Sequence, residues 1–386
     1  MRWAYRCPSC GAEYPIEPGR YLCEACGSHN APGMPLEGVL ECVFEGRPEP
    51  GSTPLPVEAE HFPPIPVGST PLWAPVRLRE RLGLPGLWLK DDTCEPSGSY
   101  KDRASLLVAA FARKHGLGEV ALASTGNAAS SMACVGAAAG LKVTVFVPRT
   151  APAAKRVQVL QYGAELREID GSYDLAFDAC LAYTRETGVL SRNTAYNPLT
   201  IEGKKTASFE TLRDLRRATG DRKAAPDHVF VPTGDGVIVA GVVKGFEDLV
   251  AMGELDRVPT VWVAQAEGSS AIARALETGA WEFRPSDTLA DSISVDAPRN
   301  GYFALAKLRA RGGRGVRVSD GEILDAQRLG SSLAGLFAEP SSACALAGLV
   351  KARGAIGKDE TVIVMLTGSG LKDVKNAARA VGADIA

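Results

Sequence analysis

The sequence contains no apolar run that approaches the roughly 20 residues needed to span a bilayer. Its opening stretch, MRWAYRCPSC, lacks the apolar core of a signal peptide. The formal net charge of -2 gives no sign of a surface for nucleic acid or for an anionic membrane. With an ordinary content of 45% hydrophobic and 23% charged residues, these absences predict a cytoplasmic enzyme or binding protein.

A disulfide framework is not expected either. Four of the nine cysteines are grouped near the start of the chain. The others are dispersed, mostly among apolar or small residues, which is typical of reduced and buried thiols. They are Cys42, Cys94, Cys134, Cys180 and Cys344.

The grouped cysteines form two CxxC pairs, Cys7 with Cys10 and Cys23 with Cys26, with twelve residues between the pairs and a glycine after each. Two such turns offer four thiolates, which together form a closed tetrahedral metal site. Because a closed site leaves no coordination position for a substrate, the spacing predicts a structural zinc ion. Iron in a rubredoxin-like site is the alternative. We expect a zinc-ribbon-like unit over residues 1–45.

Residues 47–72 are rich in proline and predict an extended arm rather than a helix. Beyond them, expected strands alternate with expected helices, which predicts an α/β fold with parallel sheets and crossover helices. The strands are expected at 87–90, 120–123, 141–148, 165–169, 228–232, 261–266 and 361–366. The helices are expected at 106–115, 128–140, 153–163, 173–187, 237–253 and 341–353, with one or more in 319–338.

We expect three further parts after the zinc-ribbon-like unit. Residues 46–100 are the extended arm and the start of the catalytic domain. Residues 101–220 form a smaller α/β lobe, and residues 221–386 form a larger one.

Four turns that lead into expected helices carry unusual residues. They are Glu95–Ser105 with Lys101 inside it, STGN at 124–127, TGDG at 233–236 and TGSGLKD at 367–373. Ligands of open α/β folds bind at the carboxyl ends of strands, and free N–H groups at helix starts suit phosphate. Taken singly, each feature has an ordinary interpretation. The lysine would be a solvated charge, the two glycines of TGDG would form a simple turn, and Asn127 would be a helix N-cap. Their joint occurrence in this order favours a ligand site.

The same turns carry a resemblance to a known family. The stretches GSTPLW…LWLKDDTCEPSGSYKDRAS, ASTGNA, NPLTIEGKKTASFE and MLTGSGLKDV resemble the motifs of fold type II pyridoxal-phosphate enzymes, and most of all those of threonine synthase. The match runs from about Gly68 to Val374, and some members carry an N-terminal zinc-ribbon-like piece. The resemblance implies two open parallel-sheet lobes that bind pyridoxal 5'-phosphate. In this sequence Ala128 follows STGN and Tyr100 precedes the lysine, where the family usually has other residues, and we interpret Tyr100 as a larger core ring.

By this resemblance Lys101 is the catalytic residue and binds the cofactor aldehyde. A lysine near other cations and away from bulk water has a lowered pKa, which makes it a nucleophile and a proton carrier. Asn127 would bond the pyridine 3'-oxygen, and Thr367 would lie against the pyridine nitrogen. The family often has Asn at Asp235, so this carboxylate must point away from phosphate. Backbone N–H groups would hold the cofactor phosphate, from Gly234, Asp235, Gly236, Val237 and Ile238.

The implied reaction is a β,γ-replacement that converts O-phosphohomoserine and water to L-threonine and phosphate. A second phosphate site for this small phosphorylated amino acid is then needed. The best candidates are Ser124, Thr125 and Lys204, followed by Ser99, Arg103 and Lys205. For the two lysines a solvated helix face is an equally good interpretation.

A related fold type II lyase is the alternative function: a threonine or serine dehydratase, or a cysteate-synthase-like β-replacement enzyme. A non-catalytic interaction protein on a degenerate scaffold is disfavoured by the intact Lys101 and STGN turn. Members of the family are commonly dimers, so a homodimer is expected.

Overall fold

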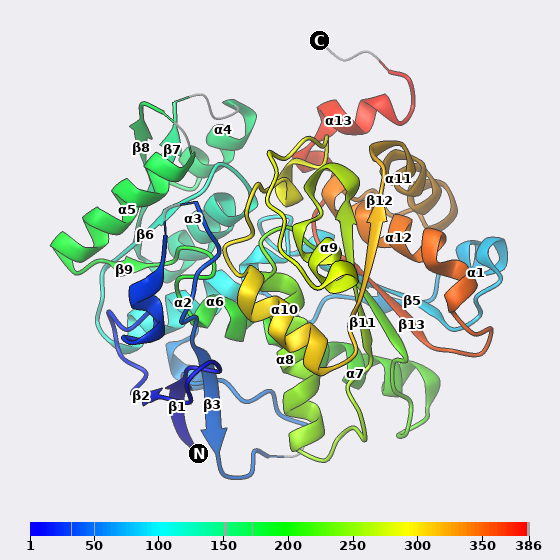
Figure 1. The fold of residues 1–386 in the computed structure, drawn as a ribbon, viewed down its shortest axis with the longest axis horizontal. Helices are drawn as coiled ribbons and strands as arrows, with labels where there is room; N and C mark the ends of the chain where they lie inside the picture. The colour runs from blue at the N-terminus through cyan, green and yellow to red at the C-terminus, as the bar shows by residue number, and fades with distance from the viewer. Residues whose placement is uncertain (32, 50, 150–152, 172, 384–386) are drawn as a thin grey trace. The chain divides into compact units, whose positions relative to one another are not determined.

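The computed structural model describes the chain in five stretches (Figure 1), namely residues 1–31, 33–49, 51–149, 153–171 and 173–383. They divide into two compact units. Unit 1 contains Met1–Gly68 and Glu95–Lys204, and unit 2 contains Ser69–Cys94 and Lys205–Ala386. None of the helices in the described part of the chain is both long and apolar enough to cross a membrane.

Unit 1 is built around a parallel sheet with the strand order β8-β7-β6-β9. Its central strands, β6 (Glu119–Ala123) and β7 (Lys142–Pro148), are almost wholly buried, as expected for strands covered on both faces. The outer strands are β8 (Glu165–Ile169) and β9 (Leu190–Ser191). The helices are α2 (Lys101–Lys114), α3 (Asn127–Ala139), α4 (Ala153–Gln161), α5 (Tyr173–Thr187) and α6 (Leu199–Glu202).

A small antiparallel sheet with the order β2-β1-β3 also belongs to unit 1. Its strands are β1 (Arg2–Arg6), β2 (Glu13–Tyr14) and β3 (Glu41–Glu45). Tyr5 and Cys42 of this sheet are buried in the same core cluster as Phe111 of α2 and Val145 of β7. The N-terminal sheet therefore shares the core of the parallel sheet.

Unit 2 has a six-stranded sheet with the order β12-β11-β10-β13-β5-β4, in which β4 alone of the described strands runs antiparallel to its neighbour. The adjacent strands β10 (His228–Pro232) and β13 (Val362–Leu366) are buried throughout. The other strands are β4 (Leu72–Trp73), β5 (Leu87–Asp91), β11 (Thr260–Ala266) and β12 (Arg314–Val318). The helices are α1 (Val76–Leu82), α7 (Thr206–Thr219), α8 (Val237–Ala251), α9 (Ala271–Thr278), α10 (Gly301–Ala310), α11 (Asp320–Ala334), α12 (Pro340–Ala352) and α13 (Val374–Arg379).

Two helices of unit 2 begin at clear local signals. The hydroxyl of Ser319 accepts the N–H of Glu322 at 3.2 Å, while the Glu322 carboxylate accepts the N–H of Ser319 at 2.7 Å. This reciprocal capping box starts α11. Helix α12 begins with Pro340, whose missing N–H would have no partner in the first turn of a helix in any case.

The predicted α/β fold with parallel sheets is confirmed, and so are the predicted strands, to within two residues at either end. The helix expected at 106–115 begins earlier, at Lys101, directly after the N-cap residue Tyr100. The arm at 47–72 contains a single short 3-10 turn, Ala59–His61, among its described residues. One expectation about the dispersed cysteines is wrong at Cys94, which is exposed, whereas the other four are buried.

Candidate active site

Lys101 is the first residue of α2 and is partly exposed, whereas the residues that follow it, Asp102 to Ser105, are buried. Ahead of it, Gly98 has a φ of 81° and donates its N–H to the carbonyl of Glu95 at 2.7 Å. The Asp102 carboxylate accepts the N–H of Ser97 at 2.7 Å and also its hydroxyl. The turn and the helix are thereby tied together, and the lysine side chain leaves a buried helix start at one defined point.

Tyr100 is fully buried, as expected for a core ring, but its hydroxyl also has a partner. It donates to the carbonyl of Lys204 at 2.7 Å. The guanidinium of Arg103 lies 5.4 Å from the centre of the ring and 3.5 Å from the carboxylate of Glu95. The tyrosine therefore joins the start of α2 to the segment that carries Lys204.

The STGN turn follows β6, and α3 begins at its last residue. The hydroxyl of Ser124 accepts the N–H of Gly126 at 3.2 Å, which keeps the turn tight. Gly126 is the N-cap, so Asn127 is the first residue inside the helix. The interpretation of Asn127 as a helix N-cap is therefore wrong. Asn127 and Ala128 are both buried. The positive end of the α3 dipole therefore coincides with this turn.

Helices α2 and α3 pack against each other in unit 1. The hydroxyls of Ser105 and Ser131 meet at 2.7 Å. Each serine lies four residues after the predicted site residue of its helix, Lys101 in α2 and Asn127 in α3, a rise of about 6 Å. Both site residues therefore lie about one helical turn from the same contact.

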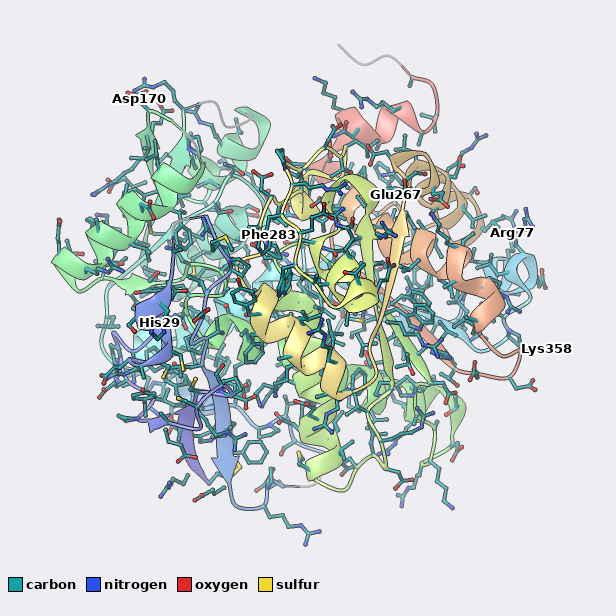
Figure 2. All side chains as sticks on the ribbon, viewed as in Figure 1. His29, Arg77, Asp170, Glu267, Phe283 and Lys358 are labelled. Carbon is teal, nitrogen blue, oxygen red and sulfur yellow. The ribbon has the colours of Figure 1, made fainter. Side chains whose placement is uncertain are left out.

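Lys204 and Lys205 lie in a 3-10 turn, Gly203–Lys205, directly after α6. Exposed lysines such as Lys358 extend from the surface (Figure 2), whereas both of these are 0% exposed. The interpretation of the two lysines as a solvated helix face is therefore wrong. A Cβ atom at Gly203 would lie 2.4 Å from the carbonyl oxygen of Arg103, so only glycine permits this approach to α2.

The Nζ atom of Lys205 lies 2.8 Å from the carboxylate of Asp248, and that of Lys244 lies 3.0 Å from the same carboxylate. Burial by itself would raise the pKa of Asp248, but the two ammonium groups outweigh burial and hold this pKa below its ordinary value. All three side chains are largely buried in unit 2. Lys205 is thus part of a structural ion triad.

In unit 2, the TGDG turn joins β10 to α8. Gly236 has a φ of 85°, and a Cβ atom there would lie 2.9 Å from the Cβ of Ala304. A Cβ atom at Gly234 would lie 2.9 Å from the Cα of Ile293. The first turn of α8 leaves backbone N–H groups without helical partners, and no side chain caps it. The turn is therefore a glycine cradle at the positive end of a 15-residue helix.

Asp235 lies in this cradle, and its carboxylate is oriented by the loop before α10. The Arg299 N–H donates to Oδ1 of Asp235 at 3.2 Å, and the Asn300 N–H donates to its carbonyl at 3.0 Å. The side-chain amide of Asn300 also donates to the carbonyl of Gly236 at 3.2 Å. The first bond holds the carboxylate toward Arg299, and the other two hold the backbone of the cradle against Asn300.

Thr367 directly follows β13, the strand beside β10. Because neighbouring parallel strands end at the same edge of a sheet, Thr367 and the TGDG turn share that edge. The N–H of Thr367 donates to the hydroxyl of Ser342 at 2.7 Å, and Thr367 is buried. A Cβ atom at Gly368 would lie 2.3 Å from the carboxylate of Glu339, which explains the glycine after the threonine.

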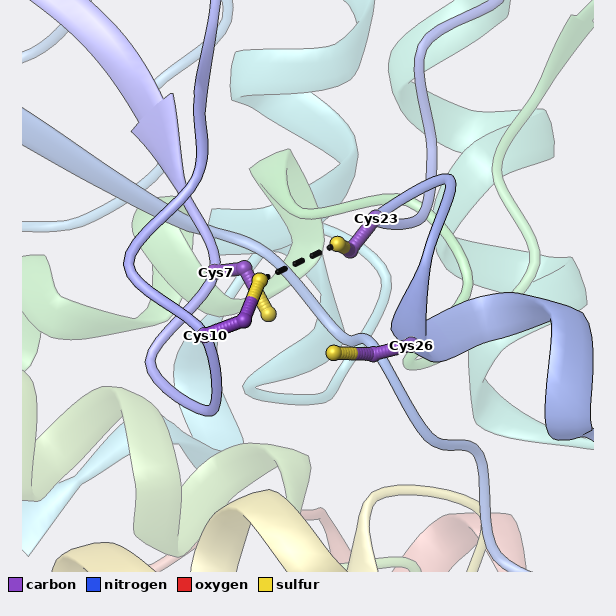
Figure 3. Close-up of side chains that lie close together, drawn as sticks. All are labelled: Cys7, Cys10, Cys23 and Cys26. Atoms are coloured by element: carbon purple, nitrogen blue, oxygen red, sulfur yellow. Dashed lines mark hydrogen bonds between the residues drawn. The ribbon is translucent and has the colours of Figure 1, made fainter.

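The four N-terminal cysteines converge on one point, two from each loop (Figure 3). Their sulfur atoms all lie within 4.8 Å of one another, and those of Cys10 and Cys23 are 3.6 Å apart. Sulfur atoms about 2.3 Å from a tetrahedral zinc ion lie about 3.8 Å apart. The two loops fold alike, because Gly11 donates to the carbonyl of Cys7 at 2.8 Å and Gly27 to that of Cys23 at 2.9 Å. The four thiols can hold one metal ion.

Residues 65–368 match the family described as pyridoxal-phosphate dependent enzyme. The chain belongs to this family. A threonine synthase of Methanosarcina acetivorans is 34% identical over 95% of this chain and 92% of its own length. One of Methanocaldococcus jannaschii is 32% identical over 97% of this chain and 94% of its own length. The resemblance to threonine synthases is thereby confirmed.

Two solved structures have the same fold as this chain. The first is the processed form of threonine deaminase isoform 2 from Solanum lycopersicum. Its TM-score is 0.70 at 22% identity, over 81% of this chain and 87% of that one. The second is a serine racemase of maize, with a TM-score of 0.69 at 22% identity, over 79% of this chain and 89% of that one.

The residues of each unit fit pyridoxal phosphate, the cofactor of this family. The glycine cradle of unit 2 offers backbone donors to a phosphate, and its one carboxylate is engaged by Arg299. In unit 1, the partly exposed Lys101 supplies a primary amine at the start of a helix whose next four residues are buried. The donor set is thus that of an anion cradle and a primary amine.

Three supporting residues were not predicted from the sequence of this pyridoxal-phosphate enzyme. Asn193 accepts the N–H of Ala123 at 2.7 Å, just before the STGN turn. Ser342 accepts the N–H of Thr367, and Asn300 holds the glycine cradle. Each is an ordinary polar residue far along the chain from the turn that it supports. Asn300 lies in the stretch ADSISVDAPRNGYFAL, residues 290–305, which resembles a further motif of the family and could have pointed to this residue.

Replacing Gly236 with alanine is expected to weaken binding of pyridoxal phosphate at least about tenfold. The new Cβ would need a left-handed backbone, at a cost of about 1 kcal/mol, and would press on Ala304 beside the cradle. A fluorescence titration with the cofactor measures the affinity. Gly253→Ala is the matched control, because Gly253 lies two residues after the end of the same helix, with a φ of 75° and open space around it. Equal affinities in the two variants would contradict the role of the cradle.

Proposed function

We propose that this chain is a threonine synthase that converts O-phosphohomoserine and water to L-threonine and phosphate. The observation that carries the proposal is the 34% identity to a threonine synthase over 95% of the chain. The family is that of pyridoxal-phosphate-dependent enzymes, and threonine synthases are lyases. The amine, the STGN turn and the glycine cradle described above are the chemical groups that this reaction requires.

In this proposal four kinds of group hold the cofactor: an amine, a side-chain amide, backbone N–H groups and a hydroxyl. The Lys101 amine would hold the cofactor aldehyde, and Asn127 would donate a hydrogen bond to its ring oxygen. The N–H groups of residues 234–238 would hold its phosphate. Thr367 would offer a neutral hydroxyl to the ring nitrogen. When bound, pyridoxal phosphate supplies an electron sink for the charge that develops at the substrate Cα.

Lys101 also moves protons in the proposed mechanism. After the substrate amine has displaced Lys101 from the cofactor, the freed lysine amine would remove the proton from Cα and then one from Cβ. Phosphate would leave from Cγ, which takes up a proton. Water would add at Cβ, and a proton would return to Cα. A general base must lie within hydrogen-bonding reach of the protons that it removes. The position of Lys101 at a rigid helix start supports this role, because Asp102 ties the preceding turn to the helix.

We assign the phosphate of the substrate to Ser124, Thr125 and Lys204. Ser124 and Thr125 lie at the positive end of α3, which favours an anion. Lys204 supplies a buried positive charge from a backbone that Tyr100 anchors. A buried cation interacts more strongly with an anion than an exposed one does.

The proposed function is tested by incubating the protein and pyridoxal phosphate with O-phosphohomoserine, and separately with threonine and with serine. Inorganic phosphate, threonine and 2-oxo acid are measured together. Equal amounts of phosphate and threonine support the proposal. A 2-oxo acid from threonine or serine alone would replace it with a dehydratase, the activity of the solved deaminase with this fold. Phosphate without threonine would point to another lyase of the family.

A homodimer remains a prediction, which sedimentation velocity tests.

We also propose that Cys7, Cys10, Cys23 and Cys26 bind one structural zinc ion. The sulfur separations support a tetrahedral site, and the hydroxyl of Tyr14 lies 3.3 Å from the Cys23 sulfur, where it supports the ligand. The zinc would be structural because the four thiolates leave no open coordination position.

Replacing Cys10 with serine is expected to reduce the bound metal from one ion per chain to much less than one, and to lower the thermal stability of the protein. Cys10 is exposed, so its replacement changes the metal site and leaves core packing intact. Mass spectrometry of the metals and a thermal unfolding scan measure both effects. Cys94→Ser is the control, since it removes another exposed thiol outside the cluster. Unchanged metal content in Cys10→Ser would exclude the site, and iron in place of zinc would correct the metal.

A further inference from the structure

Residues 191–197, here called the relay segment, connect β9 to α6 in unit 1. Its backbone is strained at Ala195, which is fully buried and has a φ of 66°. A side chain with a Cβ rarely adopts this left-handed conformation. Such strain persists where the surrounding structure holds it in place, and it gathers at functional sites.

One support of the relay segment comes from the cysteine-bearing part of the chain. The N–H of Ser191 donates to the hydroxyl oxygen of Tyr21 at 2.8 Å. The ring of Tyr21 stacks on that of Tyr196 with 4.7 Å between centres and 29° between planes. Tyr21 therefore contacts the relay segment near both of its ends. It lies two residues before Cys23, so the loop that would bind the metal also positions this tyrosine.

The relay segment in turn holds the end of β6. The side-chain oxygen of Asn193, which is fully buried, accepts the N–H of Ala123 at 2.7 Å. Ala123 is the last residue of β6, and Ser124 of the STGN turn comes next. A hydrogen bond at this point fixes where the turn begins.

The relay segment also continues toward Lys204. The Asn197 amide donates to the carbonyl of Ser191 at 2.7 Å, and its oxygen accepts the N–H of Leu199 at 2.9 Å. Leu199 starts α6, and the 3-10 turn with Lys204 follows that helix directly. The relay segment therefore supports both proposed phosphate-binding elements of unit 1. It holds the end of β6 before the STGN turn, and it holds the start of α6 before Lys204.

We propose that Tyr21 and Asn193 are positioning residues, through which the cysteine-bearing loop holds the Ser124–Asn127 turn in the conformation that binds substrate. The inference rests on the proposed function, which assigns this turn to the cofactor and the substrate phosphate. It gives the N-terminal cysteine loop a part in substrate binding, because the loop positions the tyrosine that braces the relay segment.

The test uses the full-length protein loaded with pyridoxal phosphate and compares Tyr21→Phe with Tyr183→Phe. The control is closely matched. The hydroxyl of Tyr183 donates to Glu119 at 2.9 Å, at the opposite end of the same strand β6. Each variant therefore loses one tyrosine hydroxyl that contributes to a hydrogen bond in unit 1. Two quantities are measured: the KM and kcat for O-phosphohomoserine, and the rate of amide hydrogen exchange over residues 119–130.

Tyr21→Phe is expected to raise KM about fivefold with little change in kcat, and to speed exchange over residues 119–130 about fivefold, as the loss of one hydrogen bond predicts. Tyr183→Phe is expected to leave KM unchanged. Equal shifts in the two variants would mean that the hydroxyls are merely structural, and would overturn the inference. If no threonine forms at all, the proposed function fails, and the exchange comparison alone supports or overturns the role of Tyr21.

A second pair of variants tests Asn193 directly. Asn193→Asp keeps an oxygen that accepts the N–H of Ala123, so it should retain slow exchange and a low KM. Asn193→Ala leaves that N–H without its acceptor and should behave like Tyr21→Phe or worse. If the aspartate and alanine variants show equal rises in KM and equal rises in amide exchange, the hydrogen bond to Ala123 does not position the Ser124–Asn127 turn. The inference is then wrong.

Discussion

Lys101→Ala is expected to lower threonine formation by at least about a thousandfold, because the variant loses both the nucleophile for the cofactor aldehyde and the proposed base at Cα. The cofactor should also become removable by gel filtration, since no covalent bond to the chain remains. Steady-state kinetics measures the first effect, and the cofactor absorbance that stays with the protein measures the second.

The matched control is Lys114→Ala at the opposite end of the same helix. The Nζ atom of Lys114 lies 2.9 Å from the carboxylate of Glu58 in a partly exposed ion pair, which contributes about 0–1 kcal/mol. Its loss should leave turnover unchanged. Retention of turnover in Lys101→Ala, with the Lys114 variant equally active, would overturn the assignment of the catalytic lysine.

Asp248→Asn is expected to lower the free energy of unfolding by about 3–5 kcal/mol. The substitution removes the carboxylate that the buried ammonium groups of Lys205 and Lys244 share, and breaking a buried ion pair by removing one partner is strongly destabilising. Denaturation by urea measures the loss. Asp359→Asn, at an exposed position of the same unit, should change stability by no more than about 0.5 kcal/mol.

The same triad predicts how this effect depends on pH. The pKa of Asp248 is lower in the folded chain than in the unfolded chain, so its stabilising effect is fully present above the ordinary carboxyl pKa of about 3.9. It is lost as the pH falls through the lower, folded value. The difference in stability between Asp248→Asn and the parent protein should therefore be largest near neutral pH and should narrow in acid. A constant difference down to strongly acidic pH would show that the carboxylate is not held in its charged form by the lysines.

Much of the fold could be predicted from the sequence alone. Apolar runs such as HVFVP and TVIVML are buried on both faces, so their pattern by itself indicates central parallel strands. The strand β12, RGVRV, was missed because it lies at a sheet edge, where the exposed Arg314 and the partly exposed Arg317 interrupt the apolar pattern. The start of α2 at Lys101 was missed because no local signal marks it, since Tyr100 and Lys101 do not cap a helix.

The sequence by itself determined which chemical groups this protein offers: the lysine in the SGSYKDR stretch, the glycine turns and the four thiols at metal-binding spacing. Short motifs hold such groups within a few residues, so local chemistry is enough to find them. Only the tertiary structure decided which charges are buried and what supports each turn. It buried Lys204 and Lys205, turned Asp235 toward Arg299, and brought Tyr21 and Asn193 to the relay segment. These contacts join residues far apart in the chain, and they form only when the whole core packs.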